Sequence, residues 1–287
     1  MPELPEVQAL ATDLDARLRG RTIDRLQIVA FSALKTYDPP VEALSGGRIA
    51  GVGRRGKFLD ISTAGGIHLV LHLARAGWVR WRQGAPQTSG RPGHGPLAAR
   101  LVLDDGSGFD VTEAGTKKSL AVYLVREPTQ VPGIARLGPD PLADSFTLDV
   151  FRRILAAQGR AQLKGVLRDQ SVIAGIGNAY SDEILHVAKM SPYKPAAMDE
   201  ADSATLYDAL RSTLSDAVAR ADGVPATELK AEKKSNLRVH GRFGEPCPVC
   251  GTTIQQVIYA DRTFQYCPGC QTGGKKLSDR VLDRLLK

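Results

Sequence analysis

The chain opens Met1-Pro2-Glu3-Leu4-Pro5-Glu6, and an amphipathic pattern follows directly. Apolar residues recur there at the spacing of one helix face: Val7, Leu10, Leu14 and Leu18. Gly20 stands where such a helix would end. The sequence therefore predicts an amino-terminal helix that has the Pro2 nitrogen at its start.

Removal of Met1 would expose the Pro2 nitrogen as a secondary amine, which is a nucleophile when unprotonated. The positive end of a helix dipole disfavours the protonated amine and should lower its pKa below the model range of about 7.7 to 8.0. Glu3 and Glu6 act in the opposite direction. Both acids are also favourable first-turn residues, and by itself the stretch favours that plain structural role.

Residues 21–125 change to short alternating apolar runs between glycine-rich turns, the pattern of a β domain. Two hairpins are expected, one pairing residues 58–61 with 67–73 and one pairing 101–103 with 109–111. His68 and His72 share one face of their strand. Because residues four apart on a strand are separated by roughly 13 Å, they cannot bind one ion, and we interpret them as structural or as lining a groove.

Two stretches rich in proline and glycine interrupt the pattern. Residues 83–96 are predicted to form a mobile surface loop, and residues 128–141 a domain boundary. Helical spacing returns after the boundary and surrounds the turn Gly175-Ile176-Gly177-Asn178. This turn lacks the third glycine and the preceding strand of a dinucleotide-binding fingerprint, so we reject that function.

A helix that starts at Asn178 after two glycines would offer backbone amides to a phosphate. The alternative is an ordinary helix corner capped by Asn178, which the usual preference for such caps favours in the absence of other evidence.

Four cysteines form the most specific local pattern, Cys247-Pro-Val-Cys250 and Cys267-Pro-Gly-Cys270. Two CxxC pairs at this spacing are typical of a tetrahedral four-thiolate zinc site, and we prefer this interpretation to disulfides. The residues between the pairs predict a hairpin with Asp261 and Arg262 at its tip. Such a hairpin can hold an arginine rigidly outward, although many zinc ribbons only stabilise folds or bind protein.

The composition is that of a soluble globular protein, and its basic C-terminal third suits phosphate binding or an ordinary solvated surface equally well. The chain has 287 residues and a net charge of +7, and residues 226–287 contain eleven Lys or Arg against six Asp or Glu. No apolar run is long enough to span a bilayer, and acidic residues interrupt the position of a signal peptide. We expect a cytoplasmic location, in association with the nucleoid if the source is bacterial.

Taken together, several motifs resemble the formamidopyrimidine-DNA glycosylase and endonuclease VIII family of base-excision enzymes. They occur in the family's order: MPELPEV at the start, GRRGKFLDI around Lys57, LGPDPL, LRDQSVIAGIGNAYSDEIL, VHGRFGEPC and DRTFQYCPGCQ. The resemblance covers nearly the whole chain. It implies an α+β fold with an N-terminal helix on a two-layer β-sandwich, then a helix-two-turn-helix domain and a C-terminal four-Cys zinc finger.

The predicted domains follow from this division. They are a catalytic helix and β-sandwich at 1–127, a linker at 128–144, a helix-two-turn-helix domain at 145–225, a zinc hairpin at 226–274 and a basic tail at 275–287. The resemblance implies a monomer that binds one structural Zn²⁺ and double-stranded DNA containing a damaged base or an abasic site, with no membrane partner.

The resemblance also implies roles for single residues. Pro2 would attack C1′ of a flipped damaged nucleotide, and β- then δ-elimination would cut the strand. Glu3 would be the acid–base residue, Glu6 would position the amine, and Lys57 would bind phosphate or relay protons. Asn178 and Arg262 would hold the phosphates that flank the flipped nucleotide.

Two segments depart from the family pattern. Arg75 stands where members that read 8-oxoguanine insert a methionine, and Lys117 and Lys118 occupy a loop in which those members have an Arg-Phe pair. Residues 226–239 look too short and too charged for the loop that covers 8-oxoguanine. We therefore expect poor 8-oxoguanine excision, with Arg75 stacking in the gap and the two lysines contacting phosphates. Oxidised pyrimidines, ring-opened purines and abasic sites remain as substrates, and a protein that only binds DNA damage, or only cleaves abasic sites, is the alternative.

Overall fold

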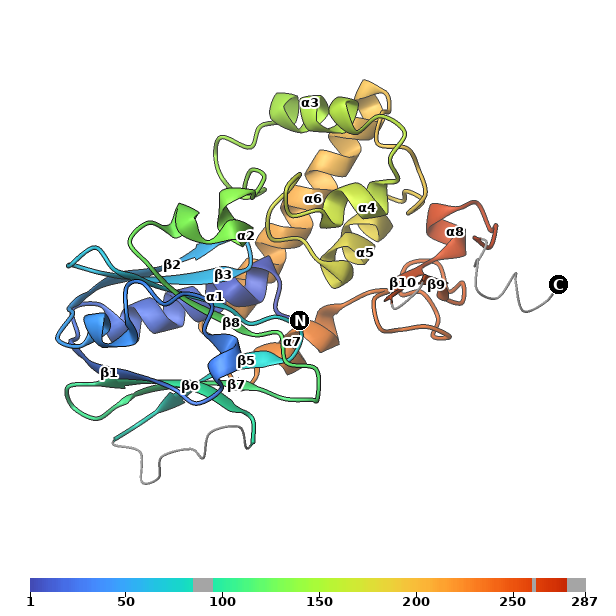
Figure 1. Ribbon diagram of the computed structural model, residues 1–287. Coiled ribbons are helices and arrows are strands. Elements are labelled where there is room, and N and C mark those ends of the chain that lie inside the picture. Colours follow the sequence, from blue (N-terminus) through green and yellow to red (C-terminus); the bar gives the residue numbers. More distant parts are fainter. Residues whose placement is uncertain (85–94, 260–261, 278–287) are drawn as a thin grey trace. The chain divides into compact units, whose positions relative to one another are not determined.

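Figure 1 shows a computed structural model of the chain, which describes residues 1–84, 95–259 and 262–277. The chain divides into two compact units. The first contains Met1–Arg136 and Ala221–Leu229, and the second contains Leu137–Arg220 and Lys230–Lys287. The finer division into five segments stays a prediction. Most of the expected surface loop, residues 85–94, lies outside the described residues.

The amino-terminal helix α1, Leu4–Leu18, forms where the apolar spacing predicts it, and its apolar face is buried. Glu3 is the N-cap, and a reciprocal capping box closes the first turn. The Glu3 amide donates to Glu6 Oε2 at 2.8 Å, and the Glu3 side chain accepts from the Glu6 amide. Two of the backbone amides that a helix start leaves unsatisfied thereby gain partners.

Eight strands follow α1, as the β pattern predicts, and they form two antiparallel four-stranded sheets (Figure 1). One sheet has the order β1-β6-β7-β5, with β1 Ile23–Ile28, β6 Leu97–Leu103, β7 Gly108–Glu113 and β5 Gly77–Arg82. The other has the order β2-β3-β4-β8, with β2 Ile49–Arg55, β3 Phe58–Thr63, β4 His68–His72 and β8 Ala121–Val125. Both predicted hairpins are confirmed, since β3 pairs with β4 and β6 with β7.

The core of the first unit joins α1 to both sheets in one apolar cluster. Polar contacts fix the same packing at its edge: Asp15 Oδ1 accepts from the Val52 amide at 2.7 Å, and Arg54 Nε donates to Gln8 Oε1 at 3.1 Å. The Trp78 indole donates to the Ala226 carbonyl at 2.8 Å, which attaches the returning segment Ala221–Leu229. Helix α1 is therefore fixed against strand β2 along its length.

The stretch 128–136, which ends the longer part of the first unit, is more regular than its sequence suggests. It carries the short helices η3, Pro128–Gln130, and α2, Pro132–Ala135, each with a proline in its first turn. Two further short helices, η1 Phe31–Ala33 and η2 Val41–Leu44, lie within the first unit.

The second unit combines helices with a hairpin. Its helices are α3 Leu148–Gln158, α4 Leu163–Arg168, α5 Asn178–Val187, α6 Glu200–Ala221, α7 Leu229–Asn236 and α8 Pro268–Gln271. The hairpin predicted between the cysteine pairs is confirmed as β9, Gln255–Tyr259, and β10, Arg262–Tyr266. Helix α7 occupies the charged segment for which the sequence analysis predicted no element. No helix in the described ranges is long and apolar enough to cross a membrane.

Replacing Glu6 with Ala should lower the free energy of unfolding of the first unit by about 1 to 2 kcal/mol, because the buried Glu3 amide loses its acceptor. Tryptophan fluorescence during urea unfolding measures this unit specifically, since both tryptophans, Trp78 and Trp81, belong to it. Glu6→Gln, which keeps an oxygen acceptor, is the control. Equal losses for the two variants would contradict the role of the capping bond.

Candidate functional site

The amino-terminal residues gather their functional groups in one helical turn. Pro2 is buried, and Glu3 and Glu6 are each 2% exposed. The capping box fixes both carboxylates in the helical turn that follows Pro2, so the structural role that the sequence favours is present. It does not exclude chemistry, because a buried carboxylate held next to an amine is placed to exchange a proton with it.

Lys57 lies in the turn between β2 and β3 and is 7% exposed. Gly56 precedes it with a φ of +55°, a conformation that favours glycine. The Arg54 side chain joins this turn to α1 by donating to the Gln8 side chain and to the Gly56 carbonyl. A buried lysine is thus held on the strand pair against which α1 packs.

His72 is coupled to the Lys57 turn. Its ring lies 4.7 Å from the ring of Phe58, centroid to centroid. Burial and, second, the positive charge of Lys57 lower the pKa of His72 to about 4, so the imidazole is neutral at physiological pH. His68, on the same strand face, instead pairs with Asp60 at 2.7 Å. The two histidines have separate partners, as expected for residues that do not share an ion.

The two segments that depart from the family pattern lie next to each other in the first unit. Arg75 is exposed in the turn between β4 and β5, and Lys117 and Lys118 are exposed in the loop between β7 and β8. The segments meet where the Ala114 amide donates to the Ala76 carbonyl at 3.3 Å. Lys118 Nζ also donates to the Glu113 carbonyl, so of the two lysines it is the one engaged at the base of the loop.

The backbone of the Arg75 turn is tightly constrained. Ala74 has a φ of +51°, and the Gly77 amide donates to the Leu73 carbonyl at 2.8 Å. A Cβ on Gly77 would lie 2.1 Å from that carbonyl oxygen, so only glycine fits there. The turn therefore presents the Arg75 side chain from a fixed backbone.

In the second unit, one face of α5 carries polar groups at intervals of four residues: Asn178, Asp182 and His186. Asp182 is 1% exposed and accepts from Lys164 Nζ at 2.6 Å, from His240 Nδ1 at 2.6 Å and from the Gln265 amide at 3.2 Å. Its charge is balanced by the buried ammonium of Lys164. Helix α5 is thereby fixed to α4 and to β10.

Glu183 extends the same network. Its carboxylate accepts from the backbone amides of residues 238–240, at distances of 2.7 to 3.0 Å. Burial raises the pKa of Glu183, while these amides oppose that shift. The sequence analysis did not single out Asp182, Glu183 or Lys164, because their partners are far apart in the chain and leave no short motif.

Asn178 is the first residue of α5, but it is not the cap. Gly177 occupies the N-cap, and the Asn178 side chain donates from Nδ2 to the Thr263 carbonyl at 2.6 Å. The alternative of a corner capped by Asn178 is therefore wrong, since its amide faces the hairpin. This contact connects the glycine turn to β10, the strand that begins at Arg262. The Arg262 side chain and the tip residue Asp261 lie outside what the structure describes.

The four cysteine sulfurs gather in one cluster at the base of the hairpin. Cys250 Sγ lies 3.3 Å from Cys267 Sγ and 3.5 Å from Cys270 Sγ, and Cys247 Sγ lies 3.9 Å from Cys270 Sγ. All four are free thiols. Zinc–thiolate bonds of roughly 2.3 Å place neighbouring sulfurs about 3.8 Å apart in a tetrahedron, so these separations fit a four-thiolate metal site.

The charges of the cluster also fit a cation. Hydrogen bonds from Thr252 lower the pKa of Cys250 to about 6, whereas burial raises the pKa of Cys267 to about 11 and also raises that of Cys270. Gathered thiolates repel one another, and a divalent cation supplies the charge that lets them ionise together. The close approach also requires a glycine, since a Cβ on Gly269 would lie 2.5 Å from the Thr252 hydroxyl.

His186 is a fifth member of this cluster that the sequence analysis missed. Its ligand atom lies within 4.8 Å of those of Cys247, Cys267 and Cys270. Burial, with a smaller contribution from Arg238, lowers the pKa of His186 to about 4. No spacing rule could find it, because it precedes the first cysteine pair by 61 residues.

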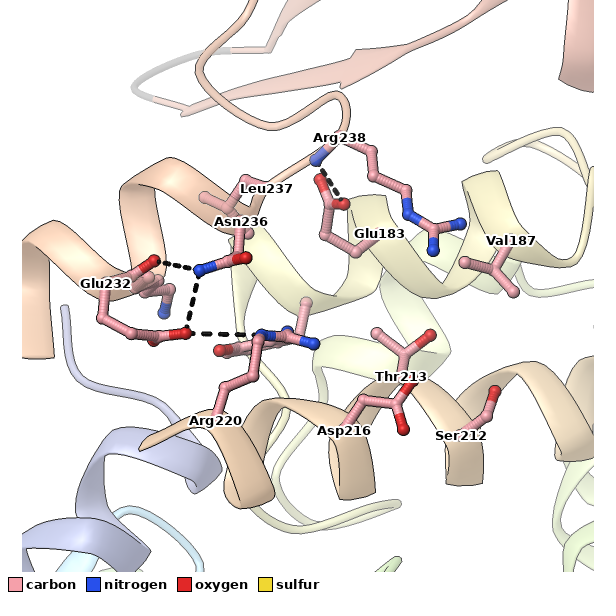
Figure 2. Close-up of a pocket in the computed structure, with 12 residues that line it drawn as sticks. Glu183, Val187, Ser212, Thr213, Asp216, Arg220, Glu232, Asn236, Leu237 and Arg238 are labelled. Atoms are coloured by element: carbon pink, nitrogen blue, oxygen red, sulfur yellow. Dashed lines mark hydrogen bonds and ion pairs between the residues drawn. The ribbon is translucent and has the colours of Figure 1, made fainter. Parts of the chain in front are cut away.

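Figure 2 shows a cavity of about 260 Å³ between α5, α6 and α7. Its lining is polar, and cationic side chains there have partners: Arg220 Nε lies 3.3 Å from Glu232 Oε1, and Lys233 Nζ lies 4.5 Å from the centre of the Tyr180 ring. The Glu183 carboxylate reaches the Arg238 amide at its wall (Figure 2). The cavity wall therefore carries both hydrogen-bond donors and acceptors, and both positive and negative side chains.

Comparisons with known proteins agree with this architecture. Residues 1–116 match the formamidopyrimidine-DNA glycosylase N-terminal domain, and residues 137–228 match the formamidopyrimidine-DNA glycosylase H2TH domain. A formamidopyrimidine-DNA glycosylase from Heliobacterium modesticaldum is 35% identical over 94% of this chain and 100% of its own length. An uncharacterized formamidopyrimidine-DNA glycosylase-like protein of Mycobacterium tuberculosis is 57% identical, over 53% of this chain and 94% of its own.

Solved structures give the same result. MutM (Fpg) from Thermus thermophilus superposes with a TM-score of 0.80 at 31% identity, over 96% of this chain and 100% of that one. Fpg from Lactococcus lactis, bound non-covalently to DNA with an abasic site, has a TM-score of 0.80 at 26% identity, over 94% and 99% of the two chains. The fold and the cysteine cluster define a DNA-repair glycosylase with a zinc-finger motif. The chain belongs to the formamidopyrimidine-DNA glycosylase family, whose members are DNA glycosylases and abasic-site lyases.

Acid should destabilise the first unit through His72. Its pKa is about 4 in the folded protein against 6.5 when unfolded, so between these values the unfolded state binds the extra proton. The stabilisation is complete above pH 6.5 and is lost as the pH falls towards 4, by up to about 3 kcal/mol. Urea unfolding followed by tryptophan fluorescence measures it, and His72→Gln should show a shallower decline. Parallel wild-type and variant curves would refute this contribution.

Proposed function

We propose that Pro2, freed by removal of Met1, is the nucleophile of a bifunctional base-excision reaction. Its amine attacks C1′ of a flipped damaged nucleotide as the glycosidic bond breaks and the base departs with a proton. The nitrogen lone pair then expels O4′, which takes a proton from Glu3, so that the sugar ring opens and an iminium forms at C1′. The resulting iminium acidifies the C2′ proton, whose loss expels the 3′ phosphate by β-elimination. Loss of the C4′ proton then expels the 5′ phosphate by δ-elimination, and water releases the sugar fragment from Pro2.

The observation that carries this proposal is the first turn of α1. Pro2 precedes a helix start whose dipole favours the unprotonated amine, and the capping box holds Glu3 next to it. We assign Glu3 as the acid–base residue that opens the sugar and returns protons, and Glu6 as the residue that fixes the turn. Lys57, on the strand pair packed against α1, binds phosphate or relays protons.

Asn178 and Arg262 are proposed to bind DNA phosphates from the second unit. Asn178 uses Nδ2 to bind the Thr263 carbonyl, which leaves the second hydrogen of the same amide for a phosphate oxygen. The contact also joins the glycine turn to β10, whose first residue is Arg262. The two residues therefore act from one connected support.

The substrate preference is proposed to differ from that of relatives that read 8-oxoguanine. A solved MutM structure is a complex with DNA containing carbocyclic 8-oxoguanine, and it superposes with a TM-score of 0.81 at 27% identity. In this chain Arg75 and Lys117 are exposed on adjoining segments. We assign Arg75 to stack in the gap left by the flipped nucleotide, and Lys117 and Lys118 to phosphate contacts. Abasic sites and lesions other than 8-oxoguanine are then the preferred substrates of a monomeric enzyme.

A protein that binds DNA damage without excising bases is the second candidate. The departures from the family pattern at Arg75, Lys117 and Lys118 favour it or a lyase-only enzyme. Borohydride trapping separates these functions. Wild-type protein should form a covalent complex with abasic-site DNA and much less with 8-oxoguanine DNA. Pro2→Gln, whose bulk retains Met1, should form none, because its nitrogen is an amide.

Pro5→Ala is the matched control, since it alters the same helical turn and leaves the amine intact, and mass spectrometry establishes the state of Met1. If no covalent complex is trapped on any of the lesions tested, abasic sites included, the catalytic proposal is overturned. Trapping on abasic DNA without release of any damaged base would leave a lyase only.

The cysteine cluster is proposed to bind one structural Zn²⁺, held by Cys247, Cys250, Cys267 and Cys270. When bound, the ion would neutralise the thiolates and stabilise the hairpin formed by β9 and β10. Cys267→Ser should lose the metal and weaken DNA binding, as measured by metal analysis and by a DNA titration. Metal content equal to that of the wild-type protein would show that the ligand assignment is wrong.

Arg262→Ala should weaken binding to abasic-site DNA and reduce the slope of log affinity against log salt by about one. Arg242→Ala, another arginine of the same segment, is the control and should keep the wild-type slope. An unchanged slope for Arg262→Ala would exclude the phosphate contact.

A further inference from the structure

Histidine 186 lies where it can act on the metal site without belonging to the cysteine pattern. Its Nε2 lies 3.3 Å from Cys247 Sγ, and the two residues are 2% and 3% exposed. The His186 side chain belongs to α5, whereas the Cys247 sulfur belongs to the segment between α7 and β9, residues 237–254, which we call the ribbon. A contact between two buried polar groups from separate elements is specific, because each has lost its water.

Five side chains compete for the four positions of a tetrahedral ion. The ligand atoms of His186, Cys247, Cys267 and Cys270 all lie within 4.8 Å of one another. Cys250 Sγ is outside that set but lies 3.3 Å from Cys267 Sγ and 3.5 Å from Cys270 Sγ. Cys250 is also held to Cys247 by the turn in which the Gly251 amide donates to the Cys247 carbonyl. Because Cys250 completes the first CxxC pair and contacts two of the other sulfurs, we assign the fourth position to Cys250 and place His186 outside the four ligands.

We propose that His186 donates a hydrogen bond from Nε2 to the metal-bound thiolate of Cys247, and so both strengthens metal binding and couples the metal site to helix α5. The inference rests on the proposed four-cysteine zinc site. Hydrogen bonds that neighbouring side chains donate to metal ligands orient these ligands and tune their charge, and losing such a partner typically lowers metal affinity about 10- to 100-fold.

The other thiolates support this role by comparison. Cys267 Sγ accepts from the Cys270 amide at 3.4 Å, and Cys250 accepts from Thr252. Four thiolates around Zn²⁺ carry a net charge of −2, which burial penalises unless donors surround it. The imidazole of His186 supplies such a donor to the Cys247 sulfur.

The second ring nitrogen of His186, Nδ1, makes the imidazole energetically unfavourable at this position. Nδ1 is buried and has no hydrogen-bond partner among the described residues. Leaving a buried polar atom unsatisfied costs about 1 to 3 kcal/mol, which an apolar ring of similar size would avoid. The benefit of histidine here therefore lies at Nε2, the nitrogen that faces the sulfur.

The coupling to α5 follows from the helix periodicity. His186, Asp182 and Asn178 are four residues apart, so they occupy one face of α5, and each contacts the ribbon or its hairpin. Loss of metal would release the His186 contact at one end of this face. The opposite end carries Asn178, the residue assigned above to a DNA phosphate.

The test uses the full-length, zinc-loaded protein and the variants His186→Phe and His186→Gln. Phe retains a ring of similar size without a donor, and Gln retains an amide donor. Transfer of metal to a chromophoric chelator should be about 10-fold faster or more for His186→Phe, with partial restoration in His186→Gln. The absorption spectrum of the cobalt-substituted protein counts the thiolates and should show four in all three proteins.

Each other outcome overturns a defined part of the inference. If His186→Phe releases metal at the wild-type rate, His186 contributes to packing only and not to metal binding. A cobalt spectrum with three thiolates and one nitrogen in the wild type, changed in His186→Phe but not in Cys250→Ser, would make His186 a ligand in place of Cys250. Absence of bound metal in the wild-type protein would refute the zinc site itself, which is a separate failure.

Discussion

Asp182 keeps its carboxylate inside the protein, and the second unit is organised around the partners that this requires. An ionised carboxylate without water needs opposite charge and hydrogen bonds, and Asp182 obtains them from Lys164, His240 and Gln265. These three residues come from α4, from the segment before the cysteines and from β10. One buried charge thus connects elements that are distant in the chain, and Glu183 repeats the arrangement with three backbone amides.

At the amino end of the first unit, buried polar groups likewise need hydrogen-bond partners. A helix start leaves amide groups without partners, and here two acidic side chains satisfy two of them reciprocally. The same bonds hold a pair of buried carboxylates beside Pro2. The capping role and the proposed chemical role therefore coincide in one turn, which explains why the sequence alone could not choose between them.

Much of the fold was predictable because its signals are local. The spacing of Val7, Leu10 and Leu14 predicts α1, the glycine-rich turns predict the hairpins β3–β4 and β6–β7, and the two CxxC pairs predict the cysteine cluster. Elements with non-local causes were missed. Helix α7 has a charged sequence and only Leu229 buried, so periodicity does not indicate it, and its beginning is held by the core of the first unit.

The site shows the same division between local and distant signals. Pro2, Glu3 and the cysteines belong to short motifs, whereas His186 is brought to Cys247 by the packing of α5 against the ribbon. Asn178 was predicted at a helix start, but its amide bonds to Thr263, a partner 85 residues away, rather than to its own helix. Contacts of this kind depend on tertiary structure and leave no spacing in the sequence.

In the turn between β4 and β5, the backbone conformation is constrained, whereas the side chain at position 75 can vary. Gly77 and the left-handed Ala74 fix its backbone, while the Arg75 side chain is exposed. A substitution at position 75 would change the exposed surface of this turn and leave the path of the chain unaltered. Under the role proposed for Arg75, lesion recognition can therefore diverge by single substitutions, while the proposed nucleophile Pro2 and the elements that hold it stay the same.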